Sequence, residues 1–323
     1  MIGACLSQGR AQTKSAVSYK NPVVDIAMPD PTVIKAADGY FYVYATESTR
    51  NVPIMKSKDL VEWTYCNTAF TNKTRPRFEP KAGIWAPDIN YINGKYVLYY
   101  AMSVWGGEQT CGIGVATANS PQGPFTDHGK MFRSNEIGVQ NSIDPSLLQY
   151  EGRNYLVWGS FRGIYVIELT ADGLSIMSGA KKKRIAGTAF EAVYIHKHGD
   201  YYYMFASIGS CCQGVKSTYK VVVGRSKKVW GPYKDKTGKP MLKNGYSLVI
   251  GANDHFVGNG HGSQIIQDDA GQDWLLYHGF SRSTPENGRI LLLDQIKWDQ
   301  EGWPYVEGGS PSYETQKAPV FNN

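Results

Sequence analysis

The stretch DPTVIKAADGYFYVYATES, residues 30–48, contains the pattern that decides the fold of this chain. An acidic residue precedes a short apolar strand, a turn with Gly follows, and a strand dense in aromatic residues then ends in small or polar ones. This second strand, Tyr40 to Tyr44, is apolar at every position, whereas a strand with one face in water alternates apolar and polar residues. The stretch therefore predicts a β-hairpin whose second strand is buried on both faces.

The same pattern recurs four more times. It appears in the segments PDINYINGKYVLYYAMS (87–103), DPSLLQYEGRNYLVWGS (144–160), EAVYIHKHGDYYYMFAS (191–207) and HGSQIIQDDAGQDWLLYHGF (261–280). A weaker hairpin follows each repeat, at residues 53–65, 112–125, 163–177, 220–233 and 289–306. Repeats of four strands over about 40–50 residues are typical of propeller blades. The sequence predicts an all-β chain that forms a five-bladed β-propeller of four-stranded antiparallel blades.

Composition agrees with one large β-rich domain. The chain has 323 residues, of which 42% are hydrophobic and 19% charged, so wholesale disorder is excluded. We expect its 22 Tyr, 11 Phe and 8 Trp residues to fill the space between blades. Because no linker separates the repeats, residues 19–323 are predicted to form a single catalytic propeller domain.

Charge and hydropathy exclude two classes of partner. The net charge of +6 is spread along the chain, and we interpret its one basic cluster, Lys181 to Arg184, as a solvated turn rather than a nucleic-acid patch. No apolar run reaches the ~18 residues that a membrane-spanning helix needs. We expect a monomer with no nucleic-acid partner and no membrane span.

The first 18 residues are predicted to be a disordered tether or the remnant of a signal sequence. Ile2-Gly3-Ala4-Cys5 has the form of a bacterial lipoprotein cleavage box, although the basic and apolar regions that usually precede one are missing. An arbitrary disordered N-terminus is the alternative. The lipoprotein hypothesis predicts a secreted, periplasmic or cell-surface bacterial protein with a lipidated Cys5.

The five cysteines lack the paired C-x-x-C spacing of a zinc site. Cys211 and Cys212 are adjacent and could form a disulfide. We expect them instead to be free buried thiols.

Acidic residues mark the start of four repeats, at Asp30, Asp88, Asp144 and Glu191. The first strand of a blade lines the central channel, so these side chains can meet at one mouth of it. Acids are poor strand formers and costly to bury, which makes four at one repeat position hard to explain by packing. Clustered carboxylates raise one another's pKa, and one protonated and one ionised carboxyl are what glycosidic-bond cleavage requires. The chain contains no G-x-S-x-G elbow, phosphate-binding loop or H-E-x-x-H motif.

These residues lie in motifs that resemble glycoside hydrolase family 43. The motifs are MPDPTVI (28–34), WAPDI (85–89), SIDPSL (142–147), WGSF (158–161) and FEAVYI (190–195). Residues 209–233, GNGHGS (258–263) and WDQEGWP (298–304) are similar to the endo-1,5-α-L-arabinanases within it. The resemblance implies a five-bladed propeller. It also implies an enzyme that cleaves arabinan or arabino-oligosaccharides of the plant cell wall with inversion of configuration at the anomeric carbon.

The resemblance also implies the roles of the acids. Asp30 would be the general base that activates a water molecule, and Glu191 the general acid that protonates the departing oxygen. Asp144 would raise the pKa of Glu191 and orient it. The carboxyls of an inverting pair are about 6.5–9.5 Å apart, which leaves room for water.

Other positions match the family's pocket and metal site. His261 would help to hold one metal ion, calcium, in the channel, with water as most of its ligands; we expect no organic cofactor. The predicted substrate-binding residues are Trp85, Asp88, Ser160, Phe161 and Cys212.

Two departures from the family pattern concern the substrate groove. Pro29 stands where many arabinanases have His, and Arg162-Gly163 stands where the family often has an aromatic residue and two glycines. The main hypothesis is internal (endo) cleavage of α-1,5-linked arabinan. The alternatives are an exo-acting α-L-arabinofuranosidase or β-xylosidase, a non-catalytic carbohydrate-binding propeller, and, less favoured, a retaining hydrolase of the invertase type.

Overall fold

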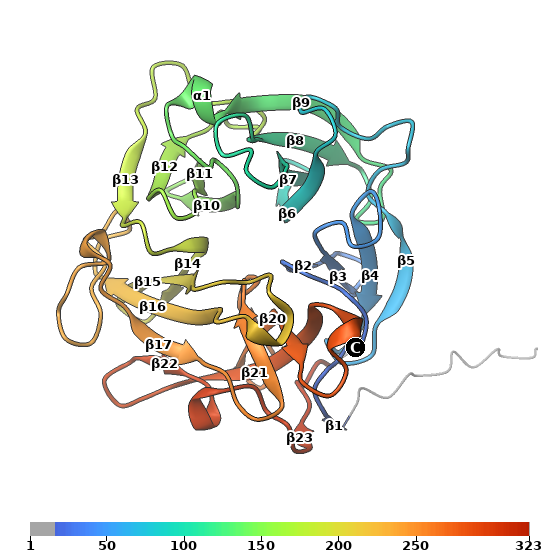
Figure 1. Ribbon diagram of the computed structural model, residues 1–323, viewed down its shortest axis with the longest axis vertical. Helices are drawn as coiled ribbons and strands as arrows, with labels where there is room; N and C mark the ends of the chain where they lie inside the picture. Colours follow the sequence, from blue (N-terminus) through green and yellow to red (C-terminus); the bar gives the residue numbers. More distant parts are fainter. Residues whose placement is uncertain (1–16, 323) are drawn as a thin grey trace, which may run out of the picture.

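The computed structural model describes residues 17–322, and in it five antiparallel sheets surround one axis (Figure 1). The strands of each sheet follow one another in sequence from the channel outward. This arrangement confirms the predicted all-β, five-bladed propeller with four-stranded antiparallel blades.

The blades have the following bounds. Blade 1 contains β2 (Thr32–Lys35), β3 (Phe41–Tyr44), β4 (Pro53–Ser57) and β5 (Thr64–Thr68). Blade 2 contains β6 (Gly83–Ile92), β7 (Lys95–Ser103), β8 (Gly112–Ala118) and β9 (Thr126–Arg133). Blade 3 contains β10 (Ser146–Tyr150), β11 (Arg153–Trp158), β12 (Ile164–Glu168) and β13 (Lys183–Ala186). Blade 4 contains β14 (Glu191–His198), β15 (Tyr201–Ile208), β16 (Lys220–Ser226) and β17 (Ser247–Ile250). Blade 5 contains β18 (Phe256–Gly260), β19 (Ile266–Gln267), β20 (Asp273–Ser281), β21 (Ile290–Trp298) and β22 (Pro304–Tyr305). In blade 5, β18 and β19 together take the innermost place, and both pair with β20.

The few remaining elements are short. They are β1 (Ser18–Tyr19), β23 (Gln316–Lys317), the helix α1 (Ser134–Ile137) and the 3₁₀ turns η1 (Gly214–Lys216), η2 (Met241–Lys243), η3 (Pro285–Asn287) and η4 (Glu307–Gly309). Within residues 17–322, no helix has the length and apolar character to cross a membrane.

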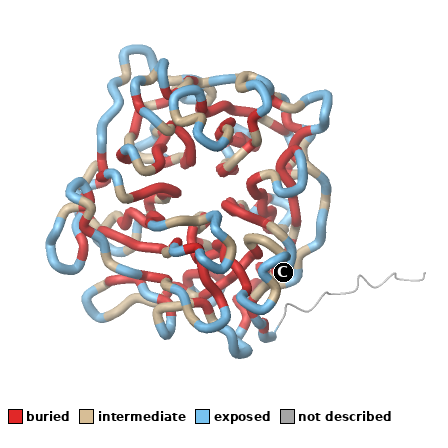
Figure 2. The backbone as a smooth tube through the Cα atoms, in the orientation of Figure 1, coloured by how far each residue is buried: buried red, intermediate tan, exposed pale blue. Residues whose placement is uncertain are grey.

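The second strand of each blade is buried on both faces, as predicted. Residues 41–44 and 273–281 are buried throughout (Figure 2). Alternate residues of such a strand pack against opposite neighbours: Leu98 and Tyr100 belong to the hydrophobic cluster between blades 1 and 2, whereas Val97 and Tyr99 belong to that between blades 2 and 3. Five such clusters, one at each interface between neighbouring blades, form the core of the described chain.

The two ends of the described chain close the ring between blades 5 and 1. Ser18 of β1 pairs with Lys317 of β23, so this strand begins inside the segment that we predicted as a tether. Tyr19 and Phe321 are buried in the cluster between these two blades. Residues 1–16, which include the predicted lipidation site Cys5, lie outside the described residues.

The outermost strands differ from the prediction. In blades 2, 3 and 4 the fourth strand begins at Thr126, Lys183 and Ser247, beyond the hairpins predicted at residues 112–125, 163–177 and 220–233. Lys183 and Arg184 therefore start an edge strand and are not part of a turn, although both are exposed. Outer strands contact solvent, so they lack the apolar run that identifies the second strands.

Candidate active site

In every blade, one residue in or next to the innermost strand has a backbone conformation in the left-handed region. These residues are Asp30 (φ 52°), Ala86 (42°), Asp144 (56°), Ala192 (53°) and His261 (51°). Asp30 and Asp144 thus occupy equivalent positions. Glu191, however, lies one residue before the left-handed residue of its blade, Ala192, and Asp88 lies two residues after Ala86. The prediction that four acids share one repeat position is therefore wrong. Register shifts in β6 and β14 accompany the difference, and a sequence pattern does not reveal a bulge of this kind.

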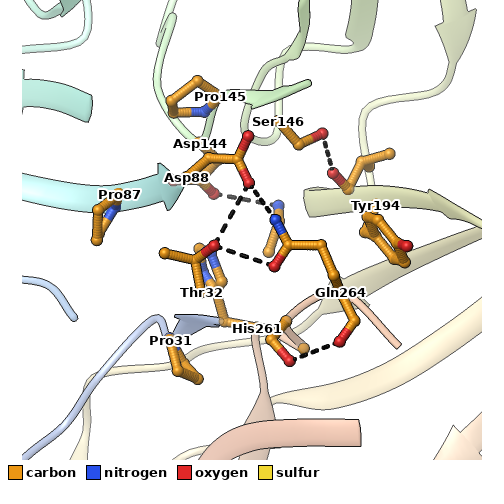
Figure 3. Close-up of a pocket in the computed structure, with 14 residues that line it drawn as sticks. Pro31, Thr32, Pro87, Asp88, Asp144, Pro145, Ser146, Tyr194, His261 and Gln264 are labelled. Carbon is orange, nitrogen blue, oxygen red and sulfur yellow. Dashed lines mark hydrogen bonds between the residues drawn. The ribbon is translucent and has the colours of Figure 1, made fainter. Parts of the chain in front are cut away.

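Asp88 lies inside the channel, where its carboxylate is occupied by hydrogen bonds (Figure 3). One oxygen accepts from Gln264 Nε2 (2.7 Å), and the other accepts from Asn90 Nδ2 (2.6 Å) and Leu147 N (2.8 Å). Burial raises the pKa of Asp88 to about 7, against the effect of these donors. The carboxylate connects blade 2 to blades 3 and 5, a contact that stabilises the centre of the ring.

Asp30 is surrounded by positive and donor groups. Its carboxylate lies 2.6 Å from Arg289 Nη1, and Thr46 Oγ1 donates to it at 2.6 Å. His261 Nδ1 lies 3.3 Å away. Burial alone would raise the pKa of Asp30, but Arg289 and His261 hold it well below its usual range. Asp30 is therefore ionised at neutral pH, as a general base must be.

Glu191 is in the opposite electrostatic situation. Burial, followed by the negative charge of Asp144, raises the pKa of Glu191 to about 7. Burial also raises the pKa of Asp144 to about 6, and Asp30 adds to this effect. Ser160 Oγ donates to Glu191 Oε2 at 2.6 Å, and Ala192 N donates to Asp144 Oδ2 at 3.1 Å. Glu191 can thus carry a proton near neutral pH while Asp30 does not.

The structure also brings His261 and Ser160 to these acids. His261 contacts Asp30, and the charges of Asp30, Asp144 and Glu191 raise its pKa against the effect of burial. Positive charge is therefore favoured at this point of the channel. A small pocket lies beside it, lined by Asp88, Asp144, His261, Ser263 and Gln264 among others.

Trp85 and Phe161 lie next to residues that hold the acids. Ala86 N, adjacent to Trp85, donates to Thr46 Oγ1, which itself donates to Asp30. The Trp85 ring packs against the exposed Trp105, with 5.4 Å between ring centroids. Phe161 follows Ser160 and has a φ of 51°.

The predicted free thiols are not present at Cys211 and Cys212. These residues form a disulfide with each other, and Cys212 is exposed. The reason is their position in the loop between β15 and β16, where no core encloses a thiol. No contact within residues 17–322 links Cys212 to the three acids.

Several residues of the site were not predicted. They are Thr46, Arg289, His278 and Tyr219. His278 Nδ1 accepts the backbone N–H of Asp30 at 3.0 Å, and its Nε2 is buried without a hydrogen bond in the described part of the chain. A signal existed for Thr46, because it is a small polar residue just after the second strand of its repeat, as is the predicted Ser160. His278 lies inside β20 and Arg289 immediately precedes β21, and neither occupies a repeat position that gave such a signal.

Comparison with known proteins identifies relatives for this arrangement. The sequence model of the glycosyl hydrolases family 43 matches residues 19–304. The chain is 36% identical over 306 residues to an extracellular exo-α-(1→5)-L-arabinofuranosidase of Cellvibrio japonicus, and the match covers 86% of each chain. It is also 36% identical over 289 residues to extracellular endo-α-(1→5)-L-arabinanase 1 of Bacillus subtilis, covering 85% of this chain and 86% of that protein.

A solved structure agrees with the sequence relatives. The fold is similar to that of a Cellvibrio cellulosa α-L-arabinanase in complex with arabinohexaose, with a TM-score of 0.80 and 34% identity. The match covers 89% of this chain and 98% of that one. The relatives include both exo- and endo-acting enzymes, so the similarity defines the family and leaves the mode of cleavage open.

Proposed function

Because this chain belongs to the glycosyl hydrolases of family 43, we propose that it hydrolyses α-1,5-linked L-arabinofuranosyl bonds of arabinan by internal cleavage with inversion. Asp30 is the general base, Glu191 the general acid, and Asp144 the residue that keeps Glu191 protonated. The observation that carries the proposal is the opposite pKa shift of Asp30 and Glu191 within one cluster of buried acids.

The chemistry follows from these protonation states. Asp30 takes a proton from a water molecule, whose oxygen attacks the anomeric carbon on the face opposite the leaving group. Glu191 donates its proton to the glycosidic oxygen as the bond between that oxygen and the anomeric carbon breaks. One attack from the opposite face inverts the configuration. Proton exchange with solvent then restores both carboxyls.

We also propose that His261 helps to hold a calcium ion in the channel. The donor set fits a largely hydrated cation: one imidazole is a poor calcium site, and Asp88, Thr32 and Gln264 already bond to one another, so water must provide most ligands. The raised pKa of His261 supports a preference for positive charge there. When bound, the ion supplies a fixed positive charge behind the acids. Metal analysis of the purified chain before and after dialysis against a chelator, with the melting temperature as second readout, tests this.

Exo-cleavage is the second candidate, supported by the relative from Cellvibrio japonicus. At the rim, Arg162 forms an ion pair with Glu108 at 2.8 Å, which joins the loop after β7 to the segment after β11. Such a bridge can narrow one side of a groove. A β-xylosidase activity and a non-catalytic binding propeller are less favoured, the latter because all three acids are present.

The deciding experiment is digestion of debranched arabinan. Oligosaccharides of several lengths in the first minutes support internal cleavage, whereas arabinose alone supports exo-cleavage. Proton NMR of the first product identifies its anomer, and a β-anomer is the result expected for inversion. Absence of any product from arabinan, together with activity on xylo-oligosaccharides, would contradict the proposed substrate.

We further propose that the chain acts outside the cytoplasm as a monomer. The location outside the cytoplasm is supported by two relatives that are named extracellular. Fractionation of producing cells and sedimentation of the purified chain test these two points.

A further inference from the structure

Two histidines and one aspartate meet where blades 4 and 5 contact each other, away from the acids. His196 and His198 are two residues apart on β14, so their side chains lie on the same face of that strand. Asp273 is the first residue of β20 in the next blade. One donor atom from each residue lies within 4.8 Å of the others.

The surroundings hold two of these donors in place. Asp273 is buried, and its carboxylate accepts hydrogen bonds from Trp298 Nε1 at 2.8 Å and Gln267 Nε2 at 3.2 Å. The His198 ring stacks on Trp298 with 3.7 Å between centroids and 8° between planes. This stacking places His198 Nδ1 3.7 Å from Asp273 Oδ2. Hydrogen bonds that orient a ligating carboxylate are typical of metal sites.

Both imidazoles have nitrogens available for a ligand. No hydrogen bond within residues 17–322 uses a ring nitrogen of His196 or His198. Both rings are only partly buried, which leaves a path from solvent.

We propose that His196, His198 and Asp273 bind one late first-row divalent metal ion of the zinc type. Two imidazoles and one carboxylate suit zinc, and they do not suit calcium, which requires many oxygen ligands. At metal–ligand distances of about 2.0–2.1 Å, tetrahedral donors lie roughly 3.3 Å apart. The three donors must therefore approach by roughly 1.5 Å or less, which side-chain rotation provides. A water molecule completes the coordination.

This site is separate from the catalytic acids and from His261. Glu191 begins β14 and His198 ends it, which at strand spacing puts them roughly 23 Å apart, at opposite ends of the strand. An ion there joins blade 4 to blade 5 and stabilises the folded chain, because it binds the native state only. It takes no part in hydrolysis.

Zinc binding to the untagged, chelator-treated chain tests the proposal. We expect one equivalent of Zn²⁺ in competition with a chromophoric chelator, and absorption bands of four-coordinate ions when Co²⁺ is used. At zinc concentrations about 100-fold above Kd, the melting temperature should rise by about 5 °C. Any rise that calcium causes at the same concentration should be equal in the parent chain and in the His198→Phe variant.

Phenylalanine variants locate the ion. His198→Phe keeps the stacking on Trp298 but removes the nitrogens, and His196→Phe removes the second imidazole. Both should lose the zinc-dependent rise while their melting temperatures without metal and their activity on arabinan remain close to those of the parent chain. His255→Phe is the matched control, because His255 stacks on Tyr313 in a similar way (3.3 Å, 4°) outside the site, and this variant should bind zinc normally.

Two results overturn the proposal. One is the absence of stoichiometric zinc binding by the parent chain at ~100 µM metal. The other is unchanged binding in both His196→Phe and His198→Phe, which would place the ion elsewhere. Since the readouts are metal binding and melting temperature, they do not depend on the proposed arabinan cleavage.

Discussion

Asp30, Asp144 and Glu191 are almost equally buried, with exposures of 8%, 8% and 7%, so burial alone does not distinguish their roles. Their neighbours do. Asp30 is paired with Arg289, whereas Glu191 has the negative charge of Asp144 and hydroxyl donors beside it. The proposed base and the proposed acid thus differ in protonation at the same depth of burial.

Removal of either carboxyl should abolish turnover while the fold remains. Asp30→Asn and Glu191→Gln should each lower kcat on arabinan by several orders of magnitude. Glu191→Gln should retain far more activity on a nitrophenyl arabinofuranoside, because that leaving group departs without a proton, whereas Asp30→Asn should lose both activities. Initial rates on the two substrates measure this, with Glu151→Gln, on an exposed turn, as the control. Near-parental turnover of arabinan in either variant is incompatible with the assigned roles.

Asp144→Asn should shift the pH dependence of kcat/KM. As the proposed general acid, Glu191 must be protonated to act, and the negative charge of Asp144 raises its pKa. The neutral amide lowers that pKa, so the basic limb should move to lower pH by about one unit, or about 1.4 kcal/mol. Profiles from pH 4 to 9 on a soluble oligosaccharide measure the shift. A basic limb that stays in place would show that Asp144 does not tune Glu191.

The acids were predictable as a set, and their positions were not. Asp30 and Asp144 precede Pro at a position shared by the repeats, so the sequence identified them directly. Glu191 and Asp88 were placed at that position too, but register shifts separate them from it. Arg289, which lowers the pKa of Asp30, comes from a segment 259 residues away in sequence, and nothing in the local pattern indicates that contact.

At the scale of strands, predictability follows burial. The second strands are apolar on both faces because both faces contact neighbouring blades, and the sequence located them. In the outer strands β9 and β5, nearly all residues are exposed or half-buried. Such segments resemble loops in composition, which explains why the fourth strands of blades 2, 3 and 4 were placed too early.

The strand β6 also controls the orientation of Trp85. A Cβ added at Gly83 would lie 2.4 Å from Trp85 Nε1, so this indole position requires glycine. If Trp85 contacts the sugar, Gly83→Ala should lower kcat/KM on arabino-oligosaccharides about tenfold, which is the loss of about 1.4 kcal/mol expected for one displaced aromatic contact. Trp85→Ala should give a loss of similar size.

The matched control for Gly83→Ala is Gly251→Ala, at the residue that follows β17. There an added Cβ meets its nearest neighbour at 3.5 Å, an ordinary contact, so kinetics should not change. A Gly83→Ala variant with parental kcat/KM would argue against a substrate role for Trp85.

The whole molecule is a ring whose blades are each made from consecutive strands, so its closure depends on contacts between the two ends. Repeats in the sequence predict the blades, but they do not predict what joins blade 5 to blade 1. The structure assigns this role to β1, β23 and the residues between Tyr19 and Met28.

Asn21 is the polar centre of this closure. Its side-chain amide donates to Leu293 O and accepts from Leu293 N, both at 2.9 Å, and also contacts Asp294. Asn21→Ala leaves the buried N–H of Leu293 without this partner, whereas Leu293 O still accepts from the Tyr19 hydroxyl at 2.9 Å. We expect a loss of about 1–3 kcal/mol in the free energy of unfolding and a fall in melting temperature of a few degrees.

Activity should distinguish closure from catalysis. Asn21 contacts none of the three acids, so Asn21→Ala should retain near-parental kcat at 25 °C and lose activity only as the temperature approaches its lower melting point. Asn67 lies in β5, and Asn67→Ala removes one exposed hydrogen bond, to Gln122 O. This control should leave the melting temperature within about 1 °C of the parent chain. If Asn21→Ala melts with the parent chain, the ring is held closed by the apolar cluster between blades 5 and 1, and the amide contributes only to the local path of the chain.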